Sequence, residues 1–199
     1  MATLKPEEYD ISYFDGRKAR YRHNAGYDKY ERWYRKDGEK SLGEFWKDYA
    51  NDLFNTYHLK GKKVLELGCA KGFVVEDLRD MGVEAYGFDI SEYAVKKASS
   101  EVKPFLTTDD ARTGLSRYKN KEFDVVCSLR FMECIPDSDI SWLITQMNRI
   151  AKFQFHVIDE QIKPNFYTNM PLEDWIKYDW SPGTILQSNE NRKKILRKP

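Results

Sequence analysis

Two acidic residues and a glycine-rich turn form the first arrangement in this chain that could do chemistry. Glu66 lies near the end of a short apolar run, Val64–Leu67, and the turn that follows extends from Gly68 to Gly72. Asp89 ends the next apolar run about twenty residues later, the spacing at which a carboxylate accepts hydrogen bonds from a ribose in a βαβ nucleotide unit. Glycine has no Cβ, so a ligand can approach this backbone closely. The arrangement predicts a nucleoside site.

The composition of the turn indicates which nucleoside ligand it would hold. It reads Glu66-x-Gly68-x-Ala70-x-Gly72, whereas the dinucleotide turn reads Gly-x-Gly-x-x-Gly. A carboxylate at the strand end gains nothing from a pyrophosphate, but it attracts a sulfonium or an α-amino group. We therefore expect an adenosine ligand that carries positive charge rather than NAD.

This stretch and the segments after it resemble the class I S-adenosylmethionine-dependent methyltransferases, over roughly residues 60–158. The resemblance is carried by segment 64–73 for the first motif, Phe88–Ser91 for the second, Asp109–Ala111 for the third, and Phe123–Val126 with Phe131–Ile135 for the fourth strand and its continuation. Ala70 stands where many members have a second glycine. Cys134 stands where many have a histidine, so no role of that histidine is carried over.

Two further pieces point to a narrower group within the family. The segment Cys69–Phe73 and the later pattern Thr168-x-x-Pro171-x-x-x-Trp175 resemble those of small bacterial or phage methyltransferases. These enzymes are similar to methyltransferase type 11 and act on small molecules or sugars.

The resemblance implies a cofactor, S-adenosyl-L-methionine, and a set of residues that hold it. Asp89 would hold the ribose hydroxyls. Asp110 would meet the adenine amino group, because the family usually follows that acid with a small residue. The expected cofactor-binding residues are Glu66, Gly68, Cys69, Ala70, Gly72, Asp89, Ile90, Asp110, Ala111 and Ser128.

Candidate catalytic residues follow the fourth and fifth expected strands, because open α/β sheets bind ligands at the carboxyl ends of their strands. Arg130 could orient an anionic or sugar-like acceptor, and Glu133 or Asp159 could serve as a general base. The competing interpretation is structural. Arg130 would then pair with Glu133, three residues on, and Asp159 and Glu160 would only begin a solvated turn.

Three functions stay open at this point. The first is methyl transfer to an oxygen or nitrogen of a small-molecule acceptor, and the second is a nucleic-acid or protein methyltransferase. The third is a binding module that holds S-adenosylmethionine without transfer. Nucleic acid is disfavoured because Ser128-Leu129-Arg130-Phe131 stands where base-methylating enzymes carry an Asn/Asp-Pro-Pro-aromatic motif. The basic stretches 17–22 and 192–198 are also short and separated.

Composition places the chain among globular proteins. It has 199 residues, of which 41% are hydrophobic and 33% charged, and its net charge is +1. No apolar run approaches the roughly 20 residues that span a bilayer, and the first residues lack the apolar core of a signal peptide. We expect a cytoplasmic protein with no membrane partner, as a monomer or a homodimer.

Cysteine and histidine spacing gives no metal-binding pattern. Cys69, Cys127 and Cys134 are odd in number and lack Cys-x-x-Cys spacing, so reduced thiols are expected rather than disulfides or a zinc site. His156 alternates with apolar residues in an expected strand. A partly buried histidine with its hydrogen bonds satisfied is therefore expected there rather than a catalytic base.

Strands that alternate with helices predict an α/β fold with a doubly wound, mostly parallel, Rossmann-like sheet of seven strands and an antiparallel C-terminal hairpin. Expected strands are 64–67, 83–89, 105–107, 123–128 and 153–158, with a hairpin of 184–187 and 194–196. Expected helices are 42–55, 73–81, 91–98, 140–150 and 171–178.

The N-terminal part is unusually aromatic. Residues 1–40 are rich in Tyr, Arg and Lys, which predicts either a lid over a site or a pair of helices that cover a sheet edge. We expect residues 1–58 to form an N-terminal helical extension and residues 59–199 to form the cofactor-binding domain, together in one compact unit.

Overall fold

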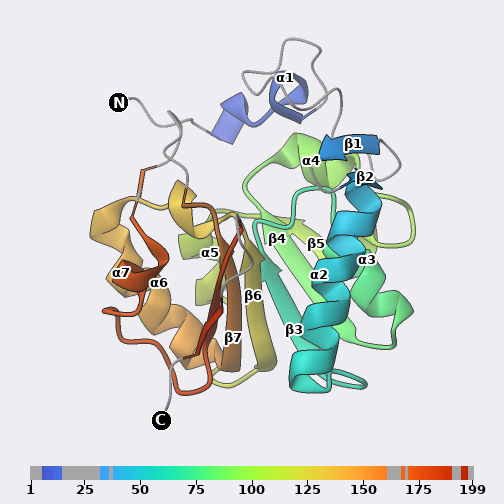
Figure 1. Cartoon of the computed structure of the whole chain (residues 1–199). Helices are drawn as coiled ribbons and strands as arrows, with labels where there is room; N and C mark the ends of the chain where they lie inside the picture. The colour runs from blue at the N-terminus through green and yellow to red at the C-terminus, as the bar shows by residue number, and fades with distance from the viewer. Residues whose placement is uncertain are drawn as a thin grey trace.

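Seven strands pair in one sheet in the order β5-β4-β3-β6-β7-β8-β9 (Figure 1). The computed structural model describes residues 6–14, 32–35, 38–160, 167–168, 170–189 and 194–196. The strands of the sheet are β3 (Lys63–Leu67), β4 (Glu84–Asp89), β5 (Leu106–Thr108), β6 (Phe123–Leu129), β7 (Ala151–Ile158), β8 (Ile185–Ser188) and β9 (Lys194–Leu196). All run parallel except β9, which pairs antiparallel with β8. The expected fold and its C-terminal hairpin are confirmed.

The strand order reverses at β3, which pairs with β4 on one side and with β6 on the other. Connections from β3 and β6 leave this point in opposite directions. A crevice therefore opens beyond the carboxyl ends of the two strands, where α/β sheets bind their ligands. The glycine turn follows β3 at this edge.

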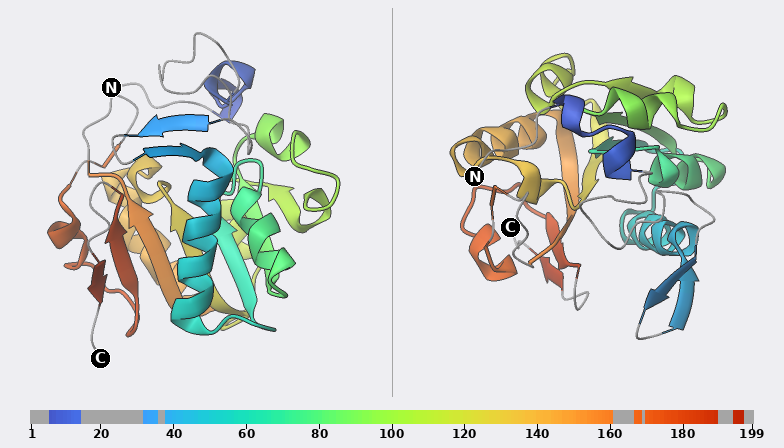
Figure 2. Two further views of the ribbon diagram at one scale, coloured as in Figure 1. Left: turned by 45° about the vertical axis from the view of Figure 1, so that its right-hand side comes forward. Right: turned by 90° about the horizontal axis from the view of Figure 1, so that it is seen from above.

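Helices cover both faces of the sheet because successive strand residues point to opposite sides. One face packs against α2 (Leu42–Tyr57), α3 (Phe73–Asp80) and α4 (Glu92–Lys96). The other packs against α5 (Ala111–Ser116), α6 (Asp137–Ile150) and α7 (Leu172–Trp175). Figure 2 shows the resulting three layers. Short 3-10 turns occur at η2 (Lys103–Phe105) and η3 (Met132–Cys134). No helix within the described ranges is long and apolar enough to cross a membrane.

The described N-terminal residues contain a hairpin that sequence patterns did not predict. Strands β1 (Arg32–Arg35) and β2 (Gly38–Ser41) pair antiparallel and lead directly into α2. Before them, η1 (Pro6–Glu8) and α1 (Ile11–Phe14) lie beyond the carboxyl edge of the sheet (Figures 1 and 2). Residues 15–31 and the side chains of the hairpin lie outside the described part of the chain.

Two other elements differ from expectation. Helix α5 was not predicted, because its first residues were interpreted as a ligand-binding turn. Asp110 caps it by accepting a hydrogen bond from Thr113 N at 2.9 Å. Helix α7 is much shorter than the expected 171–178, since it ends at Trp175. The other expected helices and strands are present with shifts of a few residues at their ends.

Candidate cofactor and acceptor site

The turn after β3 is built from residues with left-handed backbone. Gly68, Ala70 and Gly72 have φ values of 69°, 49° and 77°. An L-residue such as Ala70 adopts this conformation at a cost in free energy that glycine would avoid. Gly68 N and Cys69 N donate to Phe88 O at 2.9 and 3.1 Å, so the turn is attached to the end of β4.

Asp89 ties this turn to the start of α4. Its Oδ2 accepts a hydrogen bond from Ala70 N and its Oδ1 accepts one from Ser91 N, both at 2.8 Å. The side chain is buried, and burial raises the pKa of its carboxyl. Each carboxylate oxygen has two lone pairs, so these bonds leave acceptor capacity for a ligand hydroxyl.

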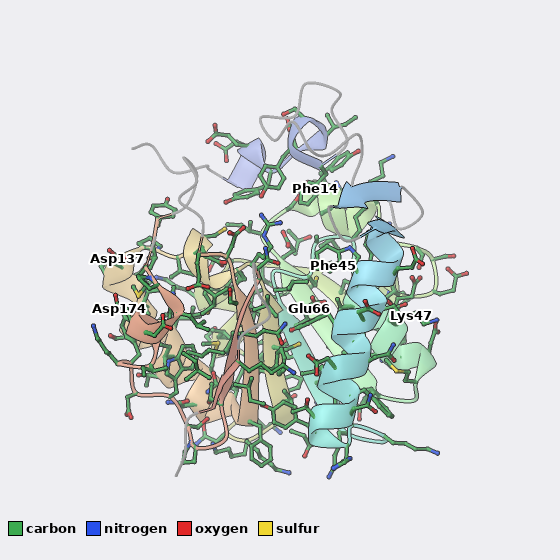
Figure 3. All side chains as sticks on the ribbon, viewed as in Figure 1. Phe14, Phe45, Lys47, Glu66, Asp137 and Asp174 are labelled. Carbon is green, nitrogen blue, oxygen red and sulfur yellow. The ribbon has the colours of Figure 1, made fainter. Side chains whose placement is uncertain are left out.

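Glu66 is buried at 3% exposure and points toward α2 (Figure 3). Its Oε2 has no hydrogen-bond partner among the described residues. Burial, followed by the charges of Asp89 and Asp77, raises the pKa of this carboxyl to about 8. It lines a small pocket together with Trp46, Gly68, Cys69, Phe73, Val74 and Leu129. A cation in this pocket would meet a buried carboxyl group whose Oε2 accepts no hydrogen bond among the described residues, and the resulting attraction would be large.

Trp46 is a pocket residue that the sequence did not reveal. It lies at helical apolar spacing in α2, a pattern that predicts packing against the sheet. That prediction is also correct, since Trp46 belongs to the core at 6% exposure. The sequence signal of Trp46 is its helical apolar spacing, which does not distinguish a pocket role from core packing.

Other expected cofactor residues have local structural roles. Asp110 is exposed and caps α5, where its Oδ2 also accepts from Thr113 Oγ1 at 3.1 Å. Ala111 is the first residue of that helix, and Ile90 is half-buried just after β4. Their proposed contacts with adenosine stay predictions.

Ser128 lies on the opposite face of the sheet from Glu66. Its Oγ is 2.8 Å from His156 Nδ1, and His156 Nε2 is 3.2 Å from Gln154 Oε1. Burial lowers the pKa of His156 to about 3. His156 is therefore a neutral histidine with both ring nitrogens hydrogen-bonded, as expected, although it is fully buried rather than partly so.

The three candidate catalytic residues come together at the carboxyl ends of β6 and β7. Arg130 Nη2 is 3.1 Å from Asp159 Oδ2, and Glu133 Oε1 accepts a short hydrogen bond from Asp159 N. Asp159 and Glu133 are buried. The structural interpretation was therefore wrong in both parts, because Arg130 forms its ion pair with Asp159 and Asp159 does not lie in a solvated turn.

The same cluster fixes a neighbouring segment. Glu133 O accepts hydrogen bonds from Tyr167 N and Thr168 N at 2.9 and 3.2 Å. Burial raises the pKa of the Glu133 carboxyl to about 7. Arg130 has a φ of 56°, a conformation that non-glycine residues adopt mainly where the surroundings impose it.

The described N-terminal residues pack directly on the glycine turn. Phe14 is buried against Ala70, Ala94 and Tyr93, and its ring lies 6.4 Å from that of Tyr93 in a stacked arrangement. Ser91 Oγ donates to Tyr9 O at 2.5 Å. Figure 3 shows Phe14 at the end of α1, beside α4. The segment 6–14 thus covers one side of the turn.

Metal-binding geometry is not found in the described ranges, where no three His, Cys, Asp or Glu side chains gather closely enough to hold an ion. Cys69, Cys127 and Cys134 are free thiols.

Comparisons with known proteins agree with this geometry. A family model described as a methyltransferase domain matches residues 34–191. The ubiquinone biosynthesis O-methyltransferase of Thiobacillus denitrificans is 34% identical over 83 residues, which are 40% of this chain and 36% of the relative. That of Idiomarina loihiensis is 30% identical over 118 residues, 53% of this chain and 46% of the relative. The chain thus spans less than half the length of these relatives.

Solved structures show the same fold. A SAM-dependent methyltransferase from Archaeoglobus fulgidus matches with a TM-score of 0.50 and 24% identity, over 55% of this chain and 48% of that one. A putative S-adenosyl-L-methionine-dependent methyltransferase from Methanococcus maripaludis matches with a TM-score of 0.50 and 10% identity, over 73% and 56%. Since the family model covers most of the sheet together with the glycine turn, the chain belongs to the methyltransferase domain family, in the S-adenosylmethionine-dependent class I.

Proposed function

We propose that this protein transfers a methyl group from S-adenosylmethionine to an oxygen or nitrogen atom of a small molecule. The observation that carries the proposal is the buried Glu66 carboxyl, which has an Oε2 without a partner among the described residues and lines a pocket beside the glycine turn. Together with Asp89, this carboxyl fits a cofactor that has a cationic amino acid portion and a ribose. Glu66 would attract the positive charge, and Asp89 would accept hydrogen bonds from the ribose hydroxyls. When bound, the cofactor supplies a methyl carbon already activated by a sulfonium.

The protein's main task in this reaction is to position the reactants. The turn from Gly68 to Gly72 and the carboxylate of Asp89 would fix the cofactor at the crevice, while Phe14 and its segment would exclude water on one side. An acceptor would enter from the side of Arg130, Glu133 and Asp159. The site would hold the acceptor atom in line with the methyl carbon and the sulfur. The bimolecular reaction between acceptor and cofactor then becomes effectively unimolecular, which is catalysis by proximity and orientation.

Two observations favour a small acceptor. The curated relatives are named as O-methyltransferases of ubiquinone biosynthesis, although the aligned parts cover less than half of each. The acceptor side of the site is a cluster of three buried or half-buried charged residues rather than an open basic track. In this proposal, residues 1–58 form an N-terminal extension and residues 59–199 form the cofactor-binding domain.

The test is incubation of the full chain with methyl-labelled S-adenosylmethionine and a metabolite extract. We expect label in a small organic product, and we expect the cofactor to raise the melting temperature while NAD does not. Label found only in protein or nucleic acid would favour the second class of function. Cofactor binding without any transfer would favour a binding module.

A further inference from the structure

Two buried polar atoms on the acceptor side lack hydrogen-bond partners among the residues that the structure describes. They are Arg130 Nε, which is a donor, and Glu133 Oε2, which is an acceptor. Buried polar atoms are normally hydrogen-bonded, so each such atom needs an explanation. Their residues are three apart, with Arg130 directly after β6 and Glu133 within η3. Burial raises the pKa of Glu133, and the charge of Arg130 partly opposes that rise.

Each of the two side chains is anchored through a different atom. The Nη2 of Arg130 is paired with Asp159 Oδ2, and the Oε1 of Glu133 accepts from Asp159 N. Asp159 thus holds both residues, and its own fully buried carboxylate is engaged with a guanidinium. This distinguishes the two candidate bases: Asp159 positions its neighbours, and Glu133 has an oxygen, Oε2, that accepts no hydrogen bond among the described residues.

The pair lies next to the cofactor turn. Arg130 is the first residue after β6, and the ring of the next residue, Phe131, packs on Gly68. The crevice beyond β3 and β6 is where the reactive methyl group would be expected. A group held between Arg130 and Glu133 would therefore lie on the acceptor side of that crevice.

We propose that the methyl acceptor is a hydroxyl group, held between Arg130 Nε and Glu133 Oε2, and that Glu133 is the catalytic base. This inference deepens the proposed function and depends on it. A hydroxyl is both donor and acceptor, so it complements the two atoms. Its oxygen has two lone pairs and can accept from Arg130 with one while attacking with the other. A neutral amine has a single lone pair and cannot do both.

The step balances without another reactant. The hydroxyl proton passes to Glu133 Oε2 while the oxygen lone pair forms the new bond to the methyl carbon. The carbon–sulfur bond breaks and its electron pair stays on sulfur, which leaves a neutral thioether. Glu133 then returns its proton to solvent. A base is most effective when its pKa lies near the working pH, and burial raises the pKa of Glu133 to about 7 despite Arg130, with Asp159 adding to the rise.

The first experiment identifies the acceptor atom. The full chain is incubated with S-adenosylmethionine carrying a ¹³C methyl group and a metabolite extract, and the carbon chemical shift of the labelled product is measured. We expect an oxygen-bound methyl group. A nitrogen-bound methyl group would overturn the inference and leave the proposed function standing. Absence of any labelled product, with cofactor binding intact by calorimetry, would overturn the proposed function itself.

The second experiment assigns the roles on that product. Glu133→Gln should lower kcat by about 100-fold or more and remove the rise of kcat near pH 7, with cofactor affinity unchanged. Glu122→Gln is the matched control. Glu122 precedes β6 at the amino-terminal end of the strands, opposite the site, and its Oε1 is 2.8 Å from Lys63 Nζ. Equal rates or equal pH profiles in the two variants would contradict the role of Glu133.

Arg130 is tested by a pair of variants. Arg130→Lys can keep a positive charge near Asp159 but loses Nε, so it should retain the melting temperature and raise the acceptor KM at least tenfold. Arg130→Met removes the positive charge as well as Nε, so it should lower the melting temperature and also raise the acceptor KM. An unchanged KM in Arg130→Lys would overturn the hydroxyl contact. If Glu133→Gln unfolds below the assay temperature, Glu133→Asp decides: a pH-dependent but slower reaction supports the base, and a pH-independent one contradicts it.

Discussion

Phe131 packs directly on Gly68, and this contact joins the acceptor side of the site to the cofactor turn. A Cβ built on Gly68 would lie 2.8 Å from Cδ2 of Phe131, closer than real Cβ contacts allow. The absence of a side chain at Gly68 therefore accommodates a neighbour within the protein as well as the approach of a ligand.

We predict that Gly68→Ala destabilises the protein through both its backbone and this contact. Gly82→Ala is the control, because Gly82 has a similar φ of 80° but nothing within 4 Å of an added Cβ. Left-handed strain alone costs about 1–2 kcal/mol and is common to both variants. Gly68→Ala should therefore lower the free energy of unfolding in urea by more than Gly82→Ala, because only its Cβ meets Phe131. Adding Phe131→Ala should recover part of the difference. Equal losses at the two glycines would show that Phe131 moves away at no cost.

Binding of S-adenosylmethionine at pH 7 should release about one proton from Glu66. The pKa of this carboxyl is raised to about 8 by burial, so the free protein holds the proton at pH 7, whereas a bound cation favours the ionised form. Affinity should consequently rise as pH increases toward 8. Calorimetry in buffers of different ionisation enthalpy measures the proton directly. Glu66→Gln should bind more weakly and release none, and proton release that persists in this variant would contradict the assignment.

His156 should make the protein less stable in acid. Because burial lowers its folded pKa to about 3, the folded state stays unprotonated while the unfolded chain takes up a proton below pH 6.5. The stability that the neutral ring contributes is complete above pH 6.5 and is lost as pH falls toward 3, at up to about 1.4 kcal/mol per pH unit. Urea unfolding at several pH values gives the free energy of unfolding as a function of pH. Its decrease toward acid pH should be shallower in His156→Gln than in the natural chain. The same slope in both would place the acid sensitivity elsewhere.

Phe14→Ala should weaken S-adenosylmethionine binding about tenfold, equivalent to about 1.4 kcal/mol, because the ring packs on Ala70 in the turn. Ile11→Ala on the same short helix is the control, since Ile11 is 57% exposed. Calorimetry should separate the two variants. If both bind the cofactor like the natural chain, the segment 6–14 covers the turn without contributing to the site.

Local patterns were sufficient for the elements that carry the fold. Apolar runs and helical spacing predicted β3, β4, β6 and α6 with boundary shifts of a few residues. They failed at α5, because an Asp that caps a helix and an Asp that binds a ligand have the same sequence appearance. The capping role of Asp110 was established only by the hydrogen bond that Thr113 N donates to it, and its expected contact with adenine stays a prediction.

The candidate site depended more on contacts between distant residues. Sequence alone placed Glu66, Asp89, Arg130, Glu133 and Asp159 at strand ends, because a parallel sheet brings those ends to one edge. It could not decide that Arg130 pairs with Asp159 rather than with Glu133, or that the Ser128 hydroxyl meets His156. Such pairs depend on strand register and on which face each side chain takes.

The sequence by itself determined the fold class, the glycine turn and the family, because these follow from short-range patterns of residue type and spacing. The tertiary structure alone decided that Asp89 holds the turn through Ala70 N, that Phe14 covers it from a distant segment, and that Glu133 has an oxygen, Oε2, that accepts no hydrogen bond among the described residues. These relationships arise from contacts between segments that lie apart in the sequence, which local patterns of residue type do not specify.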